Sequence, residues 1–576
     1  MTNADTKQHI AILGGGPAGL FVMKQLVRSG RKDLHITIFE SRERLGAGMP
    51  YSSVGANPEH VTNISENEVP ELHSNVSAWL EKLPAATLEA FDIDLPRFHA
   101  FKVLPRLLFG AYLTDQFELL VQQAADAGIE TEILLQTTVE DIANLPDSKQ
   151  VAVTSKAGTT RHFDYIVIAI GHHWPRRNEG RIPGWFDAPY PPAKLEFTAN
   201  YPVCIKGASL TAIDALKTLA RSNGNFIHKN DKLVFELSEE CPDFRLVLHS
   251  RSGLLPAVRF HLDEPGTSPD TLVSQEEISA LRAENDGFIP LDFIFERNFK
   301  DLFKEKDPEL YARIRDWDME TFVANSMDLR ERIDAFQLLK SEFAEAEKSI
   351  HRRQSIPWKE LLSELSFAMN YPAKYFSAED MLRLQKTLMP LISVIIASVP
   401  QSSAREMIAL QEAGVLELKA VGADSTFEIH PAGGTIVKYT DEEGKPHATH
   451  YNTFIDCSGQ KHFPFEAFPY KSLCKDGSVA PARLKFRTPE NAIQLRETDP
   501  DRVEEDKGDY FLKVPGIMIN DYFQVLDQYG ALNERIYILA VPYIGGYNPD
   551  YSGLDFCEAA SERVVEAMQQ SWEEQE

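Results

Sequence analysis

Three glycines near the N-terminus have the spacing of a phosphate-binding loop. Gly14, Gly16 and Gly19 follow the apolar run IAIL and precede a stretch with helical periodicity, and Glu40 ends the next apolar run. The first glycine permits a tight turn, the second lets a pyrophosphate approach the backbone, and the third lets helix and strand pack closely. The pyrophosphate would lie at the helix N-terminus, and the carboxylate can bind ribose hydroxyls. The pattern predicts a dinucleotide site.

A second loop of this kind begins at Gly207. The segment 201–220 contains an apolar strand, a turn and a helix in the required order, with Ser209 and Ala212 at the second and third glycine positions. Serine is larger than glycine but can donate its hydroxyl to a phosphate, and alanine still permits close packing. On spacing alone, a nucleotide site and an ordinary strand-to-helix joint are equally supported.

The strand after this second loop favours the nucleotide site. It ends at Ser250 and Arg251, where an NAD-preferring fold would have Asp or Glu. Hydrogen-bond donors and positive charge suit the 2′-phosphate of NADPH. The expected NADPH contacts are Gly207, Ser209, Leu210, Thr211, Ser250 and Arg251.

Several segments together resemble a known family. The loop GGGPAGL and the segments 40–53, 101–113, 163–175 and 250–256 are similar to those of bacterial FAD/NAD(P)-binding proteins, which are distantly related to class B flavin monooxygenases and amine N-hydroxylases. The resemblance covers about 1–260 and 400–576. It implies FAD at the first loop and NADPH at the second. It also implies that two similar turns, Ala169–Gly171 and Asp456–Gly459, close the FAD-binding unit on either side of an inserted domain.

The resemblance further implies which residues contact FAD. Val139 lies where relatives contact adenine through the backbone, although the sequence supports equally well an ordinary strand valine with no contact to the cofactor. A C-terminal helix starting near 552 would point its positive end at the flavin pyrimidine ring. The implied contacts are Gly14, Gly16, Pro17, Ala18 and Gly19 for the pyrophosphate, Glu40 for the ribose, Met49, Pro50, Tyr51 and Asn63 near the isoalloxazine, with Val139, Gly171, Gly459, Ser552, Gly553 and Leu554.

The predicted fold class is α/β, with two Rossmann-like dinucleotide-binding domains and a helical insertion. Residues 310–350 have apolar residues at helical spacing, which suits either a core with a solvated face or a cap over the flavin. The expected order is an FAD-binding domain over 1–200, an NADPH-binding domain over 201–265, a mainly helical insertion over 266–400, the return of the NADPH-binding domain over 401–445, and the second part of the FAD-binding domain over 446–576.

The number and spacing of the cysteines limit the possible reaction classes. The chain has five, without CxxC spacing, which counts against a disulfide reductase. We therefore expect an NADPH-dependent flavin monooxygenase acting on a small metabolite and oxygen, possibly N-hydroxylating an amine or amino acid through a C4a-hydroperoxyflavin. A flavin reductase or dehydrogenase without oxygen insertion and a non-catalytic FAD-binding protein are the alternatives. No catalytic side chain and no metal site are predicted.

Composition limits the partners. The 576 residues carry a formal net charge of −27, which repels polyanions, so neither nucleic acid nor an anionic membrane surface is an expected partner. The longest apolar run, 388–400, is too short to span a bilayer. The N-terminal segment lacks a basic stretch followed by an apolar core, which favours a cytoplasmic location. The oligomeric state is left open.

Overall fold

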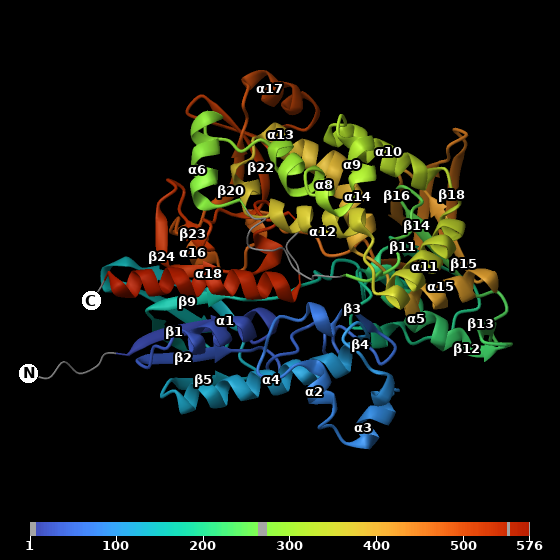
Figure 1. Ribbon diagram of the computed structural model, residues 1–576, viewed down its shortest axis with the longest axis horizontal. Helices are drawn as coiled ribbons and strands as arrows, with labels where there is room; N and C mark the ends of the chain where they lie inside the picture. The colour runs from blue at the N-terminus through green and yellow to red at the C-terminus, as the bar shows by residue number, and fades with distance from the viewer. Residues whose placement is uncertain (1–6, 263–272, 550–552, 575–576) are drawn as a thin grey trace, which may run out of the picture.

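The computed structural model describes residues 7–262, 273–549 and 553–574. Its first sheet contains five parallel strands and one antiparallel edge strand. Apolar residues fill β1, because both faces of a parallel sheet are covered. The spatial order is β23 (Gln524–Leu526), β24 (Leu532–Ile538), β9 (Tyr165–Ile168), β1 (Gln8–Leu13), β2 (Leu34–Phe39) and β5 (Glu130–Leu134) (Figure 1).

Three helices form a layer over the first sheet. In Figure 1, α1 (Pro17–Arg28) lies between α18 (Leu554–Glu573) and α4 (Arg106–Asp126), and it contacts both. Helix α18 comes from the end of the chain and α1 from its beginning. The first nucleotide unit is therefore completed only when the C-terminal segment returns.

The second sheet repeats the strand order of the first. Its five strands are all parallel. Helix α5 (Leu210–Asn223) follows the central strand, as α1 follows β1. The spatial order is β10 (Trp185–Phe186), β19 (Thr453–Asp456), β11 (Pro202–Lys206), β14 (Arg245–Ser250) and β15 (Leu416–Ala420).

The position of β19 corrects one expectation. The turn Asp456–Gly459 was predicted to close the FAD-binding unit, but β19 pairs with β11 of the second sheet, with Cys204 opposite Phe454. The turn is therefore the second unit's counterpart of Ala169–Gly171. The prediction was wrong because both units end their fourth strand in the same small-residue turn.

Each unit also carries a three-stranded antiparallel sheet between its third and fourth strands. A hairpin, β12 (Gly224–Lys229) and β13 (Lys232–Leu237), lengthens the interval between β11 and β14. The two antiparallel sheets are β6 (Val139–Leu145), β7 (Gln150–Ser155) and β8 (Thr160–Phe163) in the first unit, and β16 (Thr426–Ile429), β17 (Thr435–Thr440) and β18 (Pro446–Tyr451) in the second.

A group of helices separates β14 from β15 and forms the upper part of the molecule in Figure 1. Most of its buried side chains belong to the same apolar core as the first unit, whereas Phe336, Leu339 and Ala346 pack into the core of the second unit. The helices are α6 (Gln275–Glu284), α7 (Leu291–Phe295), α8 (Phe303–Lys306), α9 (Pro308–Ile314), α10 (Met319–Glu331), α11 (Ala335–Arg352), α12 (Pro357–Met369), α13 (Ala378–Arg383) and α14 (Met389–Ile396). The predicted fold class, two Rossmann-like units with a helical insertion, is confirmed.

The remaining elements are short, apart from helix α15 (Gln401–Glu412), which leads into β15 of the second unit. The short elements complete the first unit. They are β3 (Val61–Ser65), α2 (Val76–Leu80), α3 (Ala85–Ala90) and β4 (Val103–Pro105) after β2, and α16 (Lys471–Lys475), β20 (Pro481–Lys485), α17 (Pro489–Thr498), β21 (Val503–Asp506) and β22 (Asp509–Ile517) before β23.

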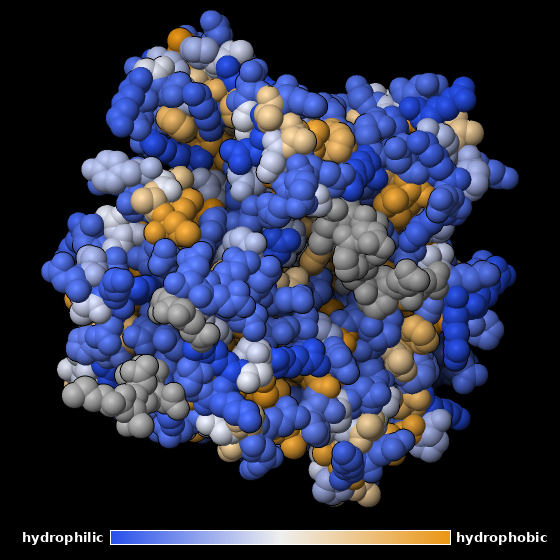
Figure 2. All heavy atoms as spheres, turned by 60° about the vertical axis from the view of Figure 1, so that its left-hand side comes forward, coloured by the Kyte–Doolittle hydropathy of each residue, from blue (hydrophilic) through white to orange (hydrophobic). Residues whose placement is uncertain are grey.

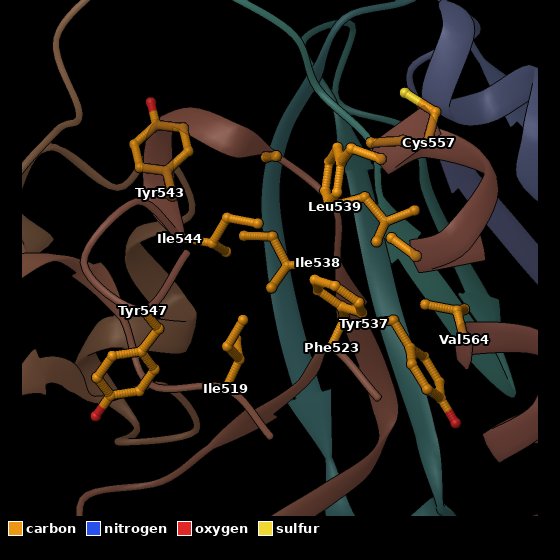
Figure 3. Close-up of a cluster of buried hydrophobic side chains, with 14 of the residues drawn as sticks. Ile519, Phe523, Tyr537, Ile538, Leu539, Tyr543, Ile544, Tyr547, Cys557 and Val564 are labelled. Atoms are coloured by element: carbon orange, nitrogen blue, oxygen red, sulfur yellow. The ribbon is translucent and has the colours of Figure 1, made fainter. Parts of the chain in front are cut away.

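The C-terminal return is held by a dense apolar cluster. Figure 3 shows Tyr537, Ile538 and Leu539 near Cys557 and Val564 of α18. The face in Figure 2 is mostly polar, with small apolar patches, in keeping with the large negative charge. No helix within the described residues has the length and apolar character needed to cross a membrane.

A buried ion pair fixes the second unit on the first. The guanidinium Nη1 of Arg106, at the start of α4, lies 2.6 Å from Oδ2 of Asp214 on α5. The hydroxyl of Tyr190 donates to the same oxygen at 2.6 Å. Because removing one partner of a buried ion pair leaves an unpaired charge, this contact strongly favours a single arrangement of the two units.

Candidate functional site

The first glycine loop has the geometry of a nucleotide-binding turn. Gly14 has φ +115°, and a Cβ atom there would overlap the carbonyl oxygen of Ala169 on the neighbouring strand end. A Cβ atom at Gly19 would overlap the carbonyl oxygen of Gly14. Gly16 is the N-cap of α1 in extended conformation, and no side chain caps the helix there. The N–H groups of the first turn of α1 are therefore available to an anion.

Glu40 lies at the end of β2 beside this loop. The side chain is buried, with 4% of its surface exposed. Its Oε2 accepts a hydrogen bond from the backbone N–H of Gly15 at 2.8 Å, and its Oε1 accepts one from that of Arg42 at 2.8 Å. These two bonds hold the carboxylate in one orientation at the edge of the sheet.

A cavity of about 520 Å³ opens from the loop. Cavities of a few hundred to about 1,000 Å³ are typical of cofactor sites. It is lined by most of the residues predicted to bind FAD: Gly14, Gly16, Pro17, Ala18, Glu40, Met49, Pro50, Tyr51, Val139, Gly171, Gly553 and Leu554.

Three predicted residues lie elsewhere, and for a fourth the structure gives no place. Gly19 packs beneath the loop, and Asn63 is exposed on β3 and does not line the cavity. Gly459 follows β19 in the second unit. Ser552 lies outside the described residues, although the helix begins at Leu554, close to the expected position.

Several lining residues were indicated only weakly, or not at all, by patterns in the sequence. His172 and His173 follow β9, and their position near a nucleotide cleft was visible only as a pair of polar residues after a strand. Tyr470 and Tyr543 belong to no motif. The further lining residues include Arg42, Thr137, Thr138, Phe556 and Cys557.

Buried polar atoms without partners lie near one end of the cavity. Within the described residues, Nδ1 of His172 and Nδ1 of His462 have no hydrogen-bond partner. Burial, and secondarily the nearby His462, lowers the pKa of His172 to about 4, and burial lowers the pKa of His462. Both imidazoles are therefore neutral near pH 7, and His172, which lines the cavity, can exchange a hydrogen bond with a bound molecule.

These features fit FAD. The α1 N-terminus can receive the pyrophosphate, and Glu40 lies where a ribose would follow. Tyr51, Tyr543 and Leu539 provide apolar surface for a ring system. The N-terminus of α18 adds a positive dipole end at the same wall.

The second loop repeats the backbone of the first. Gly207 has φ +114°, and a Cβ atom there would overlap the carbonyl oxygen of Cys457. The N–H of Gly207 donates to the carbonyl oxygen of His249 at 2.8 Å, as that of Gly14 donates to Phe39 at 2.8 Å. Ser209 is the exposed N-cap of α5, yet its hydroxyl does not cap the helix. Within the described residues, the hydroxyl of Ser209 and the N–H groups of Leu210 and Thr211 thus remain available to a ligand, whereas the N–H of Ala212 donates to the carbonyl oxygen of Ser209 at 2.8 Å.

Cations lie at the same edge of the second sheet. Arg251 is exposed directly after β14, and Lys419 is the penultimate residue of β15. Among the described residues, neither has an acidic group within ion-pair distance. Ser250 accepts a hydrogen bond from the N–H of Gly253 at 2.9 Å, and Leu210 and Thr211 open α5. Lys419 carries no motif, and only the pairing of β14 with β15 brings it to this edge.

The expected cap does not lie over the first cavity. None of the residues 310–350 lines it. Helix α12 instead lines a neighbouring cavity together with the start of α18.

Comparison with known families agrees with the first unit. Residues 11–173 match the model of a family described as FAD-NAD(P)-binding, and residues 274–396 match one described as the YdhS-like middle domain. The predicted resemblance to FAD/NAD(P)-binding proteins is confirmed, as are the two predicted cofactor classes.

Whole-chain relatives were also found. The chain is 26% identical over 565 residues to the Escherichia coli (strain K12) protein called "Uncharacterized protein YdhS", covering 97% of each chain. Among solved structures, L-lysine 6-monooxygenase from Pseudomonas syringae is 12% identical with a TM-score of 0.44, covering 98% of this chain and 99% of the other. Bacillithiol disulfide reductase from Staphylococcus aureus is 10% identical with a TM-score of 0.42, covering 98% and 99%. Such low scores carry no conclusion about activity.

Proposed function

We propose that this FAD-NAD(P)-binding protein is an NADPH-dependent flavin monooxygenase acting on a small metabolite. The observation that carries the proposal is the pairing of two equivalent loops on one chain. The first opens into a cavity that fits FAD, and the second presents Ser209 and Arg251 to solvent.

NADPH is favoured over NADH at the second loop. The strand end that holds Glu40 in the first unit holds Ser250 in the second, and Arg251 follows it. A carboxylate at this position would repel a 2′-phosphate, whereas a hydroxyl and a guanidinium attract it. Lys419 on the adjacent strand adds positive charge at the same edge.

The side chains around the first cavity would bind and shield the flavin. Bound FAD would supply the redox chemistry that links the oxidation of NADPH to oxygen. Tyr51 is partly buried at the cavity wall, and desolvation raises its pKa to about 12, so that it stays a neutral phenol. The neutral imidazole of His172 offers a hydrogen bond at the same cavity without adding charge. Such a wall keeps water away from a reactive centre.

The cysteines support oxygen chemistry over disulfide chemistry. All five are free thiols in the described structure. Cys557 lines the first cavity, and burial, with Asp555 nearby, raises its pKa. A solitary, protonated thiol lacks the partner needed for dithiol exchange.

The finer part of the proposal is the reaction. We infer N-hydroxylation of an amine or amino acid as the reaction class, which follows the motif resemblance to amine N-hydroxylases. A reductase or dehydrogenase that inserts no oxygen uses the same two cofactors. The monooxygenase and the reductase or dehydrogenase differ only in the final acceptor of the electrons.

An anaerobic titration with NADPH, followed by admission of oxygen, tests the proposal. NADPH should bleach the visible absorbance of the bound flavin, and NADH should do so much less effectively. With an amine or amino acid substrate present, oxygen should then yield hydroxylated product in proportion to NADPH consumed. Transfer of electrons to an acceptor without oxygen would instead establish the reductase. Failure of NADPH to bleach the flavin would contradict both.

A further inference from the structure

A second cavity, of about 420 Å³, adjoins the first. The two share Leu554 at the start of α18. One wall is a face of α12 that carries Glu360 and Glu364, and the facing wall is the first turns of α18. The lining carboxylates of this acidic cavity are Glu68, Glu360, Glu364, Asp555, Glu558 and Glu562.

The acidic cavity contains more negative charge than its surroundings neutralise. Among the described residues, no Lys, Arg or His lines it. Behind the walls, Lys24 lies 2.5 Å from Glu558, Lys306 lies 3.0 Å from Glu364 and 3.8 Å from Oε2 of Glu360, and Arg259 pairs with Glu68. Asp555 and Glu562 have no ion-pair partner among the described residues. Like charges on neighbouring helices repel each other, so a bound cation would stabilise this arrangement.

Glu360 provides a separate indication that a ligand binds. Its side chain is buried, with 3% of the residue exposed. One carboxylate oxygen, Oε2, accepts a hydrogen bond from the hydroxyl of Ser355 at 2.7 Å. The other, Oε1, has no partner within the described residues, and the same is true of Oε2 of Glu558. A buried carboxylate oxygen without a donor costs free energy, so both oxygens have unused capacity for a cationic donor.

The spacing of the carboxylates favours an organic cation over a metal ion. Within the described residues, no three Asp, Glu, His or Cys side chains are grouped closely enough to hold a metal. The rest of the lining includes the apolar side chains of Ile64, Leu262 and Phe367, together with Asn67 and Ser363. A charged end among carboxylates and an apolar segment against these side chains would fill such a space.

We propose that the acidic cavity binds the cationic end of an amine substrate whose other end reaches the first cavity at Leu554. A nitrogen held by carboxylates is protonated and has no free electron pair, so this nitrogen is not the reacting atom. The substrate class is therefore a bifunctional amine, with an anchoring ammonium and a separate reacting group. The role of the bound amine as a substrate rests on the proposed function, whereas binding of the cation does not depend on it.

Calorimetric titration with pentylamine and with pentanol, at fixed ionic strength and without NADPH, tests the binding. The two probes match in length and differ in charge. The wild-type protein should bind pentylamine at least tenfold more tightly than pentanol. Glu360→Gln keeps the size of the side chain but removes its charge, and should reduce this preference about tenfold. Glu562→Gln, at the exposed rim, should reduce it less and provides a variant that poses no risk to folding.

Glu331→Gln, on exposed α10 in the same insertion, is the matched control and should leave the preference unchanged. Equal binding of amine and alcohol, or an unchanged preference in both cavity variants, would overturn the proposal. If pentylamine binds but no amine supports NADPH-driven hydroxylation, the cavity stands and the monooxygenase proposal fails. If uncharged substrates are hydroxylated and no amine binds, the monooxygenase proposal stands and the proposal for the acidic cavity fails.

Discussion

The two nucleotide units have the same backbone but present different side chains to a ligand. Gly14 and Gly207 have almost the same φ, and each lies against the carbonyl of the fourth strand's end. At the second loop position Gly16 is replaced by Ser209, and at the next strand end Glu40 is replaced by Ser250. The first edge is thus acidic, and the second is basic.

This difference teaches that the glycine does not identify a nucleotide site. In both units the first glycine is required because two strand ends approach too closely for a Cβ atom. A strand-to-helix joint without a ligand would need it as well. The side chains at the carboxyl edge of each sheet are the better guide to the ligand.

The largest expected effect comes from the first glycine of either unit. Gly14→Ala and Gly207→Ala each place a Cβ atom against backbone, at a positive φ, and each should lower the free energy of unfolding by about 3 kcal/mol. Gly14→Ala should also release FAD. Thermal denaturation and the fluorescence of released flavin measure these effects.

Gly30→Ala is the matched control, because Gly30 has φ +75° and no atom within 4 Å of the added Cβ. It should cost clearly less than either loop variant. If Gly207→Ala left the free energy of unfolding unchanged, the backbone of the second loop would not be constrained as that of the first loop is.

A smaller effect is expected at the basic edge. Arg251→Ala removes a charged donor and should reduce the preference for NADPH over NADH by roughly 10- to 100-fold, since a hydrogen bond to a charged group contributes about 1.5–3 kcal/mol. Steady-state kinetics with each nucleotide measure the preference. Arg245→Ala, at the opposite end of β14, should leave it unchanged. Equal loss in both variants would rule out a specific 2′-phosphate contact.

The smallest effect distinguishes the second strands of the two sheets. His249 occupies the position that Phe39 holds in the first unit, and burial, with Lys419 nearby, lowers its pKa to about 4. Between about pH 6.5 and 4, the unfolded chain binds a proton that the folded chain does not. Stability should therefore fall as pH falls, with a slope of at most about 1.4 kcal/mol per pH unit from this group.

His249→Phe should make the pH dependence of the thermal midpoint shallower over that window. The two proteins should behave alike above pH 7 once the offset from altered packing is subtracted. An unchanged slope would show that His249 titrates normally in the folded protein.

The sequence predicted those parts of the site that depend on local order. The segment from Gly14 to Glu40 is continuous, so strand, turn and helix could be placed from spacing alone. The assignment of β19 failed because its partner β11 lies about 250 residues earlier, and both units end their fourth strand in the same turn. Pairing over such a distance leaves no local signal.

The acidic cavity shows the same limit. Glu360 and Glu364 on α12 look like an ordinary solvated helix face in the sequence. In the structure Glu360 is buried, and both side chains line one cavity together with the start of α18, almost 200 residues later. Tyr470 and Tyr543 likewise line the first cavity and belong to no motif.

The most direct test of the division of labour between the units is replacement of Ser209 by a bulky residue. Ser209 is exposed, so Ser209→Phe should leave the fold intact while covering the N-terminus of α5. FAD content and NADPH affinity are measured on the same preparation. The account predicts unchanged FAD content and NADPH affinity reduced at least tenfold. Unchanged NADPH affinity, or loss of FAD in its place, would contradict it.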